Sequence, residues 1–564
     1  MKSRPPQQLR RLFETAALAA TLAGGLVAAV PQAGAAPEAK SYAVASESPG
    51  ATHAAARVLD GGGNAFDAMV CAALISGFTN PSSSGMGGGG FAMLWSARDQ
   101  KAVVLDFRET APAGVDAELL DKRPLAENVR GQAVGVPGEV SGLFEMHQRY
   151  GKVSWRELVS RAARLAAQGF VVEPHTEGQL EEQKASPIAR SPVFRATYFP
   201  TNAPAKAGAK LRAVKLAATL RLIADQGKRG FYEGRVAQDL VNAVKAAGGS
   251  LALADLSQYQ TVERKPVQVA WDGKEVLTMP APSAGGLLLA QVLTLFSPVE
   301  LAALKDAPAK RIHLLAEAMR GAFADRMRYV ADPAFVNVDF PQLLAPERMK
   351  LRRALLAEDR THTQPRYGLE ERGTHHLITA DADGNWVSLT TTVNAPFGAK
   401  VAAEQSGVIL NNELEDFTPS ANLAVFGMTE NPNRARPGAR PTSSMAPTLV
   451  LEQGKPVLAL GGSGGLTIAP NVTQVLLGLL DGATPLQAVS APRFTIPPPK
   501  SGQTLNLEAE LAKPFGADLE ARGELILARN WKNSVQVVSR RGGTFSAAAD
   551  PRKLGLAEAK NAAQ

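Results

Sequence analysis

A β-hairpin predicted over residues 374–393 constrains the fold of this chain more than any other sequence feature. Its first arm alternates through Asp381, Asp383-Gly384 provides the turn, and the second arm runs through the Thr- and Val-rich residues 386–393. Helical patterns precede this strand-rich region and also follow it. This order favours a layered α+β sandwich in which helices cover the sheets, although it determines neither strand order nor pairing.

The other predicted elements follow from periodicity. Helices are predicted at residues 51–59, 65–74, 314–329, 472–480 and 485–489. A capping box at Ser154–Glu157 starts a further helix, which Gly169 ends. Strands are predicted at residues 91–95, 102–107, 406–411, 448–451 and 457–460.

The length and charge of the chain limit the number of domains and the classes of function that it can have. The chain has 564 residues, which is longer than the chain length at which a single hydrophobic core usually stops growing. One large composite domain or two domains are therefore expected. Hydrophobic residues make up 45% and charged residues 20%, an ordinary globular composition. The formal charge is +8, but the chain has no basic run with interleaved aromatic residues. The charge therefore favours solubility over nucleic-acid binding.

Residues 1–35 have the pattern of an export signal. Four basic residues precede an apolar run from Ala16 to about Val30, and Ala33-Gly34-Ala35 offers a small-x-small cleavage site. The apolar run is short and rich in Ala and Gly, so we expect no membrane association after the signal is removed. The predicted location is periplasmic or secreted. Arg10-Arg11 partly resembles a twin-arginine signal, but the general secretory route is expected.

Cysteine and histidine usage predicts no disulfide, metal or other cofactor. Cys71 is the only cysteine and lies in an apolar stretch, which predicts a buried, inert thiol. The neighbours His375 and His376 are on a predicted strand, so their side chains should face opposite sides and cannot bind one ion together.

Several sequence blocks, in order, resemble the γ-glutamyltransferases, also called glutathione hydrolases, which are N-terminal-nucleophile hydrolases. The blocks are residues 62–67, 87–91, 106–112, 136–138, 279–286, 316–326, 381–398, 411–417, 440–445, 461–465 and 550–552. The resemblance covers about residues 42–554 and implies a four-layer αββα sandwich. It also implies that a large-subunit-like segment (36–373) and a small-subunit-like segment (374–564) form one composite domain.

The resemblance implies a binding site for a γ-glutamyl compound such as glutathione. Such a group carries a carboxylate, an ammonium and a carbonyl to attack, so a site needs a cation, an anion and oxyanion donors. The matched residues are Arg108, Ser443 and Ser444 for the carboxylate, Asn394, Glu413 and Asp416 for the ammonium, Thr392 beside the nucleophile, and Gly464 and Gly465 for the oxyanion. Residues 422–440 match a loop that covers the site in many relatives.

The nucleophile itself has two interpretations. A match without gaps puts His375 on the nucleophile and Ile378 on a hydroxyl residue, which predicts an uncleaved chain with impaired catalysis. A slip of one residue makes Thr374 the nucleophile and Gly373–Thr374 the bond that is cut, which predicts an active transferase or hydrolase built as a heterodimer of its own fragments. The slip would require a bulge to keep the strand faces in place.

Overall fold

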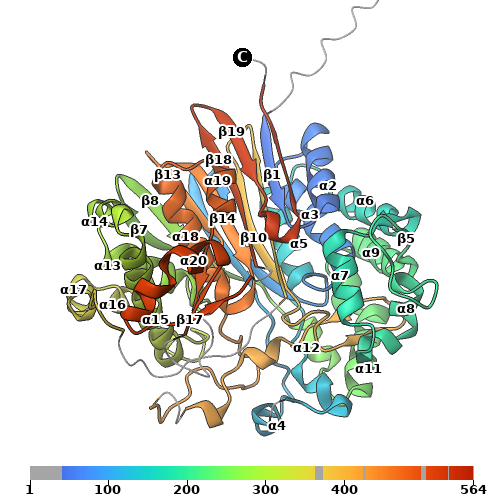
Figure 1. Ribbon diagram of the computed structural model, residues 1–564. Coiled ribbons are helices and arrows are strands. Elements are labelled where there is room, and N and C mark those ends of the chain that lie inside the picture. Colours follow the sequence, from blue (N-terminus) through green and yellow to red (C-terminus); the bar gives the residue numbers. More distant parts are fainter. Residues whose placement is uncertain are drawn as a thin grey trace, which may run out of the picture. The chain divides into compact units, whose positions relative to one another are not determined.

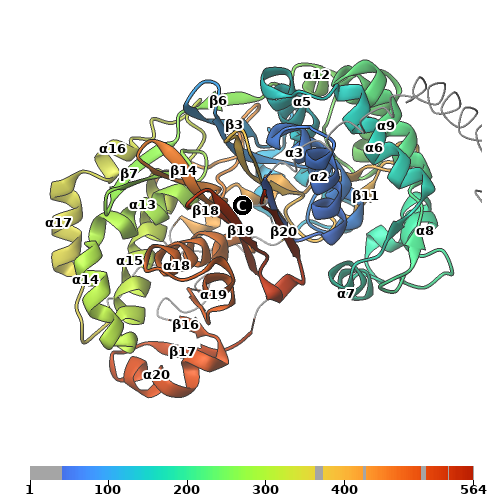
Figure 2. The same ribbon diagram turned by 90° about the horizontal axis from the view of Figure 1, so that it is seen from above.

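Two antiparallel sheets lie face to face between two layers of helices (Figures 1 and 2). The computed structural model describes residues 41–122, 124–361, 373–423, 427–496, 504–530 and 533–562. The elements below belong to one unit, Lys40–Asn561. The predicted export signal lies outside the described residues. The predicted αββα sandwich is confirmed.

The first sheet has seven strands in the order β20-β1-β9-β10-β2-β3-β6. Its strands are β1 (Tyr42–Ser46), β2 (Gly89–Ser96), β3 (Lys101–Phe107), β6 (Val262–Arg264), β9 (Thr374–Asp381), β10 (Trp386–Thr392) and β20 (Leu556–Lys560). The predicted hairpin is β9 and β10, at the centre of this sheet. This sheet mixes strands from both sides of residue 373, because β9 pairs with β1 and β10 pairs with β2.

The second sheet has six strands in the order β19-β18-β14-β13-β8-β7. They are β7 (Val267–Trp271), β8 (Lys274–Thr278), β13 (Thr448–Glu452), β14 (Lys455–Ser463), β18 (Ser534–Arg541) and β19 (Thr544–Ala548). Smaller sheets join β4 (Phe170–Val171) to β5 (Lys210–Leu211), β11 (Val401–Ala402) to β12 (Ile409–Leu410), and β15 (Phe494–Thr495), β16 (Thr504–Leu507) and β17 (Leu525–Ala528).

The helices α2 (Pro49–Asp60), α3 (Ala65–Thr79) and α5 (Glu139–Tyr150) cover the outer face of the first sheet. Leu377, Val387 and Leu389 on that face share a core with α2 and α3. Asn64 caps α3 in a capping box with Asp67, and the predicted cap of α6 (Trp155–Gln168) is Ser154, with Gly169 at its end. The outer helices α7 (Pro174–Glu182), α8 (Pro192–Tyr198), α9 (Val214–Gln226) and α11 (Gly234–Ala246) extend this side.

The helices α13 (Gly285–Leu295), α15 (Pro308–Tyr329) and α18 (Ile468–Leu480) cover the second sheet, with α19 (Pro485–Ser490) and α20 (Ala509–Ala521) nearby. Ile378 and Ala380 of β9 share a core with Leu460 of β14, so this face of β9 is buried between the sheets. Among the described residues no single helix has the length and apolarity to cross a bilayer, although α13 and the segment Pro298–Asp306, bent by 83°, meet the criteria as a pair.

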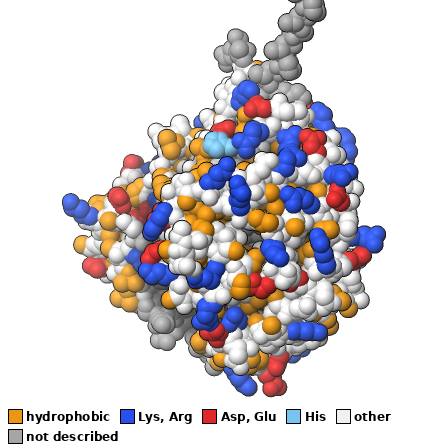
Figure 3. Space-filling model, turned by 90° about the vertical axis from the view of Figure 1, so that its right-hand side faces the viewer, with side chains coloured by type: hydrophobic (Ala, Val, Ile, Leu, Met, Phe, Trp, Pro, Cys, Tyr) orange, Lys and Arg blue, Asp and Glu red, His pale blue; other side chains and the backbone are white. Residues whose placement is uncertain are grey.

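The face over α6 to α9 carries many Lys and Arg side chains mixed with Asp and Glu (Figure 3). Ion pairs of this region are Arg156–Asp225, Lys184–Glu181, Arg190–Glu127, Lys206–Glu177 and Arg229–Glu233. Exposed pairs of this kind contribute little to stability.

Two differences from the sequence-based elements stand out. The strand predicted at 406–411 is only Ile409–Leu410, because Gly407 takes a positive φ of 74° and the chain turns there. The patterns also missed β1, which is five residues long and nevertheless pairs on both edges, with β9 and β20.

Candidate active site

The peptide between Gly373 and Thr374 leads into β9. Gly373 has a φ of 89°, and a Cβ added there would lie 2.2 Å from the carbonyl oxygen of Asn394, so glycine is required. The Thr392 hydroxyl donates to the Gly373 carbonyl at 2.7 Å and accepts the Asn394 N–H at 2.8 Å. The Gly373 carbonyl therefore has a fixed donor that would also stabilise negative charge on its oxygen.

Alternation along β9 decides which side chains face the second sheet. Residues Thr374 to Ala380 pair one-to-one with Thr392 to Trp386 of β10. The bulge that the slipped register was expected to need is absent from this pairing, because plain alternation along β9 already puts Thr374 on the inter-sheet face. His376 lies on the inter-sheet face, where a Cβ on Gly461 of β14 would meet its ring at 2.2 Å. Thr374, two residues earlier, lies on that same face.

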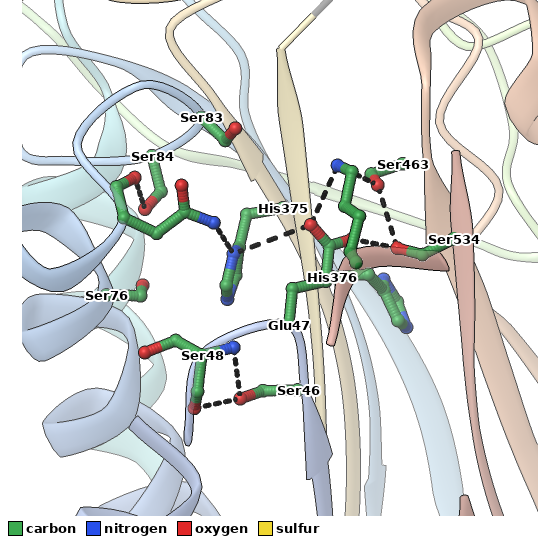
Figure 4. A network of polar contacts seen from close by, with 12 residues as sticks. Ser46, Glu47, Ser48, Ser76, Ser83, Ser84, His375, His376, Ser463 and Ser534 are labelled. Carbon is green, nitrogen blue, oxygen red and sulfur yellow. Dashed lines mark hydrogen bonds and ion pairs between the residues drawn. The ribbon is translucent and has the colours of Figure 1, made fainter. Parts of the chain in front are cut away.

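His375 lies on the opposite face, toward α3. Its Nδ1 is 3.0 Å from Asn80 Nδ2 at the end of that helix, and its side chain is fully buried. Figure 4 shows His375 and His376 on opposite sides of the strand, as predicted. Burial, and then the nearby Lys553 charge, lowers the pKa of His375 to about 3, so its ring is neutral at ordinary pH.

Arg108, at the end of β3, is the centre of a buried charged cluster. Its guanidinium pairs with Glu413 and lies 2.5 Å from Asp416, both on the 3₁₀ turn Glu413–Asp416. Asn394 Nδ2 donates to Asp416 at 3.1 Å. Burial raises the pKa of Glu413 well above its usual range, and the Arg108 charge opposes that rise. The structure thus joins the residues expected for carboxylate and ammonium, and pairs them with one another.

Ser443 and Ser444 lie on the segment that also contacts Arg108. The Arg108 guanidinium donates to the carbonyls of Pro441 and Thr442, each at 3.3 Å. Ser443 Oγ accepts the Met445 N–H at 3.2 Å, and Ser444 Oγ accepts from Arg326. Both serines are buried, at 2% exposure.

Gly464 and Gly465 form the junction between β14 and α18. Their φ values are 126° and 61°, and a Cβ on Gly464 would lie 2.6 Å from Asn533 Cβ, so a side chain would strain this turn. The junction begins the helical segment, whose first N–H groups lack partners inside a helix. The preceding residue, Ser463, shares the Lys553 ammonium with the Thr374 carbonyl, which places the junction near Thr374.

Sequence reasoning missed several charged residues around this site. Glu47 and Lys553 lie beside Thr374 and His375. Glu109 follows Arg108, and burial raises its pKa to about 8. The sequence signal that could have identified Glu109 is its position inside the matched block Asp106–Pro112. For Lys553 the signal is its position directly after the matched block Asp550–Arg552. Within the described ranges no group of three or more His, Cys, Asp or Glu residues could hold a metal ion.

Comparisons with known proteins agree with this arrangement. The γ-glutamyltranspeptidase family model matches residues 51–559. The chain is 36% identical over 564 aligned residues to a glutathione hydrolase proenzyme of Pseudomonas aeruginosa, with 96% of each chain covered. It is 34% identical over 498 residues to the acylase ACY 1 proenzyme of Pseudomonas sp. strain V22, covering 86% of this chain and 87% of that protein.

Two solved structures are also similar. The cephalosporin acylase from Bacillus halodurans has a TM-score of 0.80 at 25% identity and covers 92% of this chain and 96% of its own. A chain of Helicobacter pylori γ-glutamyltranspeptidase has a TM-score of 0.53 at 32% identity, covering 56% of this chain and 91% of its own. The family match spans almost the whole described unit. The chain therefore belongs to the γ-glutamyltranspeptidase (glutathione hydrolase) family of N-terminal-nucleophile hydrolases.

Proposed function

We propose that this protein is a γ-glutamyl hydrolase or transferase that cuts its own chain between Gly373 and Thr374 and then uses Thr374 as its nucleophile. One observation carries the proposal. Of the two candidate residues, Thr374 lies on the inter-sheet face and follows a carbonyl held by Thr392, whereas His375 faces α3. Thr374 also has the hydroxyl that the reaction needs.

The cleavage step acts on the Gly373 carbonyl, which the Thr392 hydroxyl already contacts. The Thr374 hydroxyl adds to the Gly373 carbonyl, and the Thr392 hydroxyl stabilises the developing oxyanion. The C–N bond then breaks, the nitrogen takes the hydroxyl proton, and Gly373 becomes an ester of the Thr374 oxygen. Water hydrolyses that ester, leaving a Gly373 carboxylate and a Thr374 residue with a free α-amine.

The freed amine would serve as the base in each turnover. It takes the Thr374 hydroxyl proton as the oxygen attacks the γ-glutamyl carbonyl, and the Gly464 and Gly465 N–H groups would stabilise the oxyanion. The amine of the leaving group departs with that proton. Water then gives hydrolysis of the acyl ester, or an acceptor amine gives transfer.

The charged cluster supports a γ-glutamyl substrate. The substrate carboxylate would take a share of Arg108 together with Ser443 and Ser444, and its ammonium would take Glu413, Asp416 and Asn394. In the structure Arg108 pairs with Glu413 and Asp416. In the complex the substrate carboxylate would take the place of these two carboxylates at Arg108, and the substrate ammonium would take the place of Arg108 beside them. An acyl group without the ammonium, such as glutaryl, would bring a further carboxylate to Arg108 and would offer Glu413 and Asp416 no cation in return.

The alternative is an uncleaved, catalytically impaired binding protein with His375 at the nucleophile position. It keeps the same charged cluster but has no hydroxyl for the acyl shift. The buried, neutral His375 ring bonded to Asn80 gives it no structural support. Export to the periplasm or medium is a further part of the proposal, and it depends on residues 1–35 alone.

Intact-mass spectrometry of the purified protein tests the proposal. Wild type should give two fragments, the smaller one starting at Thr374. Thr374→Ala should give one chain without activity, and His375→Gln should still be cut. The mature protein should hydrolyse γ-glutamyl-p-nitroanilide and turn over glutaryl-p-nitroanilide far more slowly. A folded wild-type chain that stays intact and inactive would favour the His375 interpretation instead.

A further inference from the structure

A buried ion pair lies directly beside Thr374. The Lys553 ammonium donates to Glu47 Oε2 at 2.9 Å, to Ser463 Oγ at 2.6 Å and to the Thr374 carbonyl at 3.2 Å. Lys553 is 5% exposed and Glu47 is 1% exposed. All three ammonium donors are therefore used, and one of them holds the backbone of the proposed nucleophile.

This cluster joins four parts of the chain. Glu47 follows β1, Ser463 ends β14, Ser534 begins β18, and Lys553 lies in the 3₁₀ turn Pro551–Lys553 before β20. Ser534 Oγ donates to Glu47 Oε1 at 2.7 Å and lies 3.1 Å from Ser463 Oγ (Figure 4). Both carboxylate oxygens of Glu47 thus have donors.

Stability alone gives little reason for such a pair. Burying two charges costs several kcal/mol per ion, and a buried pair is often no better for stability than well-packed apolar side chains. The position of this pair indicates another role. Lys553 contacts the carbonyl of the residue whose nitrogen would be released as an amine.

Two sets of charged side chains lie near Thr374, and one of them contacts its backbone. Lys553 is the cation in contact with it, and Glu47 is the counter-ion. His375 Nδ1 is 3.7 Å from Glu47, and burial keeps its ring neutral. The cluster of Arg108, Glu413 and Asp416 is linked through Asn394 and Thr392 to the Gly373 carbonyl. Lys553, with Glu47 as its counter-ion, is therefore the charged group that contacts the Thr374 backbone.

We propose that Lys553, with Glu47 as its counter-ion, is a positioning residue that fixes the Thr374 backbone and favours the neutral, proton-accepting form of the α-amine released by cleavage. This inference rests on the proposed function. An ordinary α-amine has a pKa of about 7.7–8, and a cation a few ångströms away lowers it. The amine would then be a free base over more of the neutral range, as a general base must be.

Two substitutions give opposite predictions for the pH profile of the mature enzyme. Lys553→Met removes the cation and leaves the Glu47 carboxylate, so the acid limb of kcat/KM against pH should move up by roughly one pH unit. Glu47→Gln leaves the Lys553 cation without its counter-ion, so the acid limb should move down. The double variant should lie between them, and Lys553→Arg should stay near wild type because it keeps the charge.

The control is Glu524→Gln, which removes a buried carboxylate paired with Arg320 and His313 elsewhere in the fold. It should lower Tm without moving the acid limb. Shifts of the same sign for Lys553→Met and Glu47→Gln, or no shift in either, would overturn the inference while leaving the proposed function intact. If Lys553→Met fails to mature, the direction of the Glu47→Gln shift decides alone. A wild-type chain that is neither cut nor active would overturn both.

Discussion

Thr392 donates its hydroxyl to the carbonyl that the proposed cleavage attacks, and it faces the same side of the sheet as Thr374. Replacing it with Val keeps the shape and removes this donor. We expect Thr392→Val to slow cleavage by about 100-fold or more, the usual cost of losing one oxyanion donor. The rate is measured by mass spectrometry after expression at low temperature.

Thr390→Val is the matched control, because Thr390 lies two residues away on the same face and its hydroxyl contacts His376 instead. It should mature at close to the wild-type rate. If Thr392→Val matures as fast as Thr390→Val, the Thr392 hydroxyl is not an oxyanion donor for this step.

The sequence allowed individual residues to be assigned to the candidate site, but it did not predict the contacts between them. The block matches assigned Arg108, Asn394 and Asp416 to one site, and in the structure these side chains contact one another. The direct pairing of Arg108 with Asp416 nevertheless spans 308 positions, and no local pattern predicts it. Alternation predicted that His375 and its neighbours point to opposite sides. Which face of β9 faces the candidate site depends on where the second sheet packs. That packing is tertiary structure, which local alternation does not predict.

The start of β2 passes so close to β10 that its glycines act as spacers between the two strands. A Cβ on Gly88 would lie 1.9 Å from the carbonyl oxygen of Thr392. We therefore expect Gly88→Ala to force the strands apart, to destabilise the fold by about 1–3 kcal/mol and to slow cleavage by moving Thr392. Thermal unfolding and the rate of fragment formation measure the two effects.

Gly178→Ala is the control for this element. Gly178 lies inside α7, and an added Cβ there meets nothing within 4 Å. It should leave cleavage unchanged and raise stability by up to about 1 kcal/mol. Equal effects of the two alanines would mean that the close approach of β2 and β10 is not what positions Thr392.

Elements with long periodic patterns were predictable, and short ones were not. The 22-residue α15 and the hairpin of β9 and β10 carry enough repeats to identify their type. The five-residue β1 carries too few, and its place between β9 and β20 comes from pairing with residues far along the chain. The order of both sheets was unpredictable for the same reason.

The interleaved strands make a prediction about the whole molecule after cleavage. Separating residues before 373 from those after it would break the pairings of β1 with β9 and β20, of β2 with β10 and of β8 with β13. The two fragments should therefore elute together in size-exclusion chromatography at the mass of the uncut chain and separate only in denaturant. Separate elution in native buffer would contradict the composite-domain interpretation.

Glu173 links the charge of one buried carboxyl to the stability of the whole fold. It precedes α7 and accepts the Ser48 hydroxyl at 2.7 Å and the Gly50 N–H at 3.0 Å, both at Oε1. Burial raises its pKa from 4.5 to about 7, against the effect of these hydrogen bonds. Between those pH values the folded chain binds a proton that the unfolded chain has lost, so stability falls as pH rises from about 4.5 to 7.

Glu173→Gln should remove this loss, because glutamine keeps the accepting oxygen and carries no charge. The variant should unfold at nearly the wild-type Tm at pH 5 and at a higher Tm at pH 8, with a gain on the order of 3 kcal/mol at most. Differential scanning calorimetry from pH 5 to pH 8 measures the difference in Tm between the variant and wild type. Glu520→Gln, which removes an exposed carboxylate on α20, controls for the change in net charge. A gap for Glu173→Gln that stays constant from pH 5 to pH 8 would show that Glu173 is not held protonated by the fold.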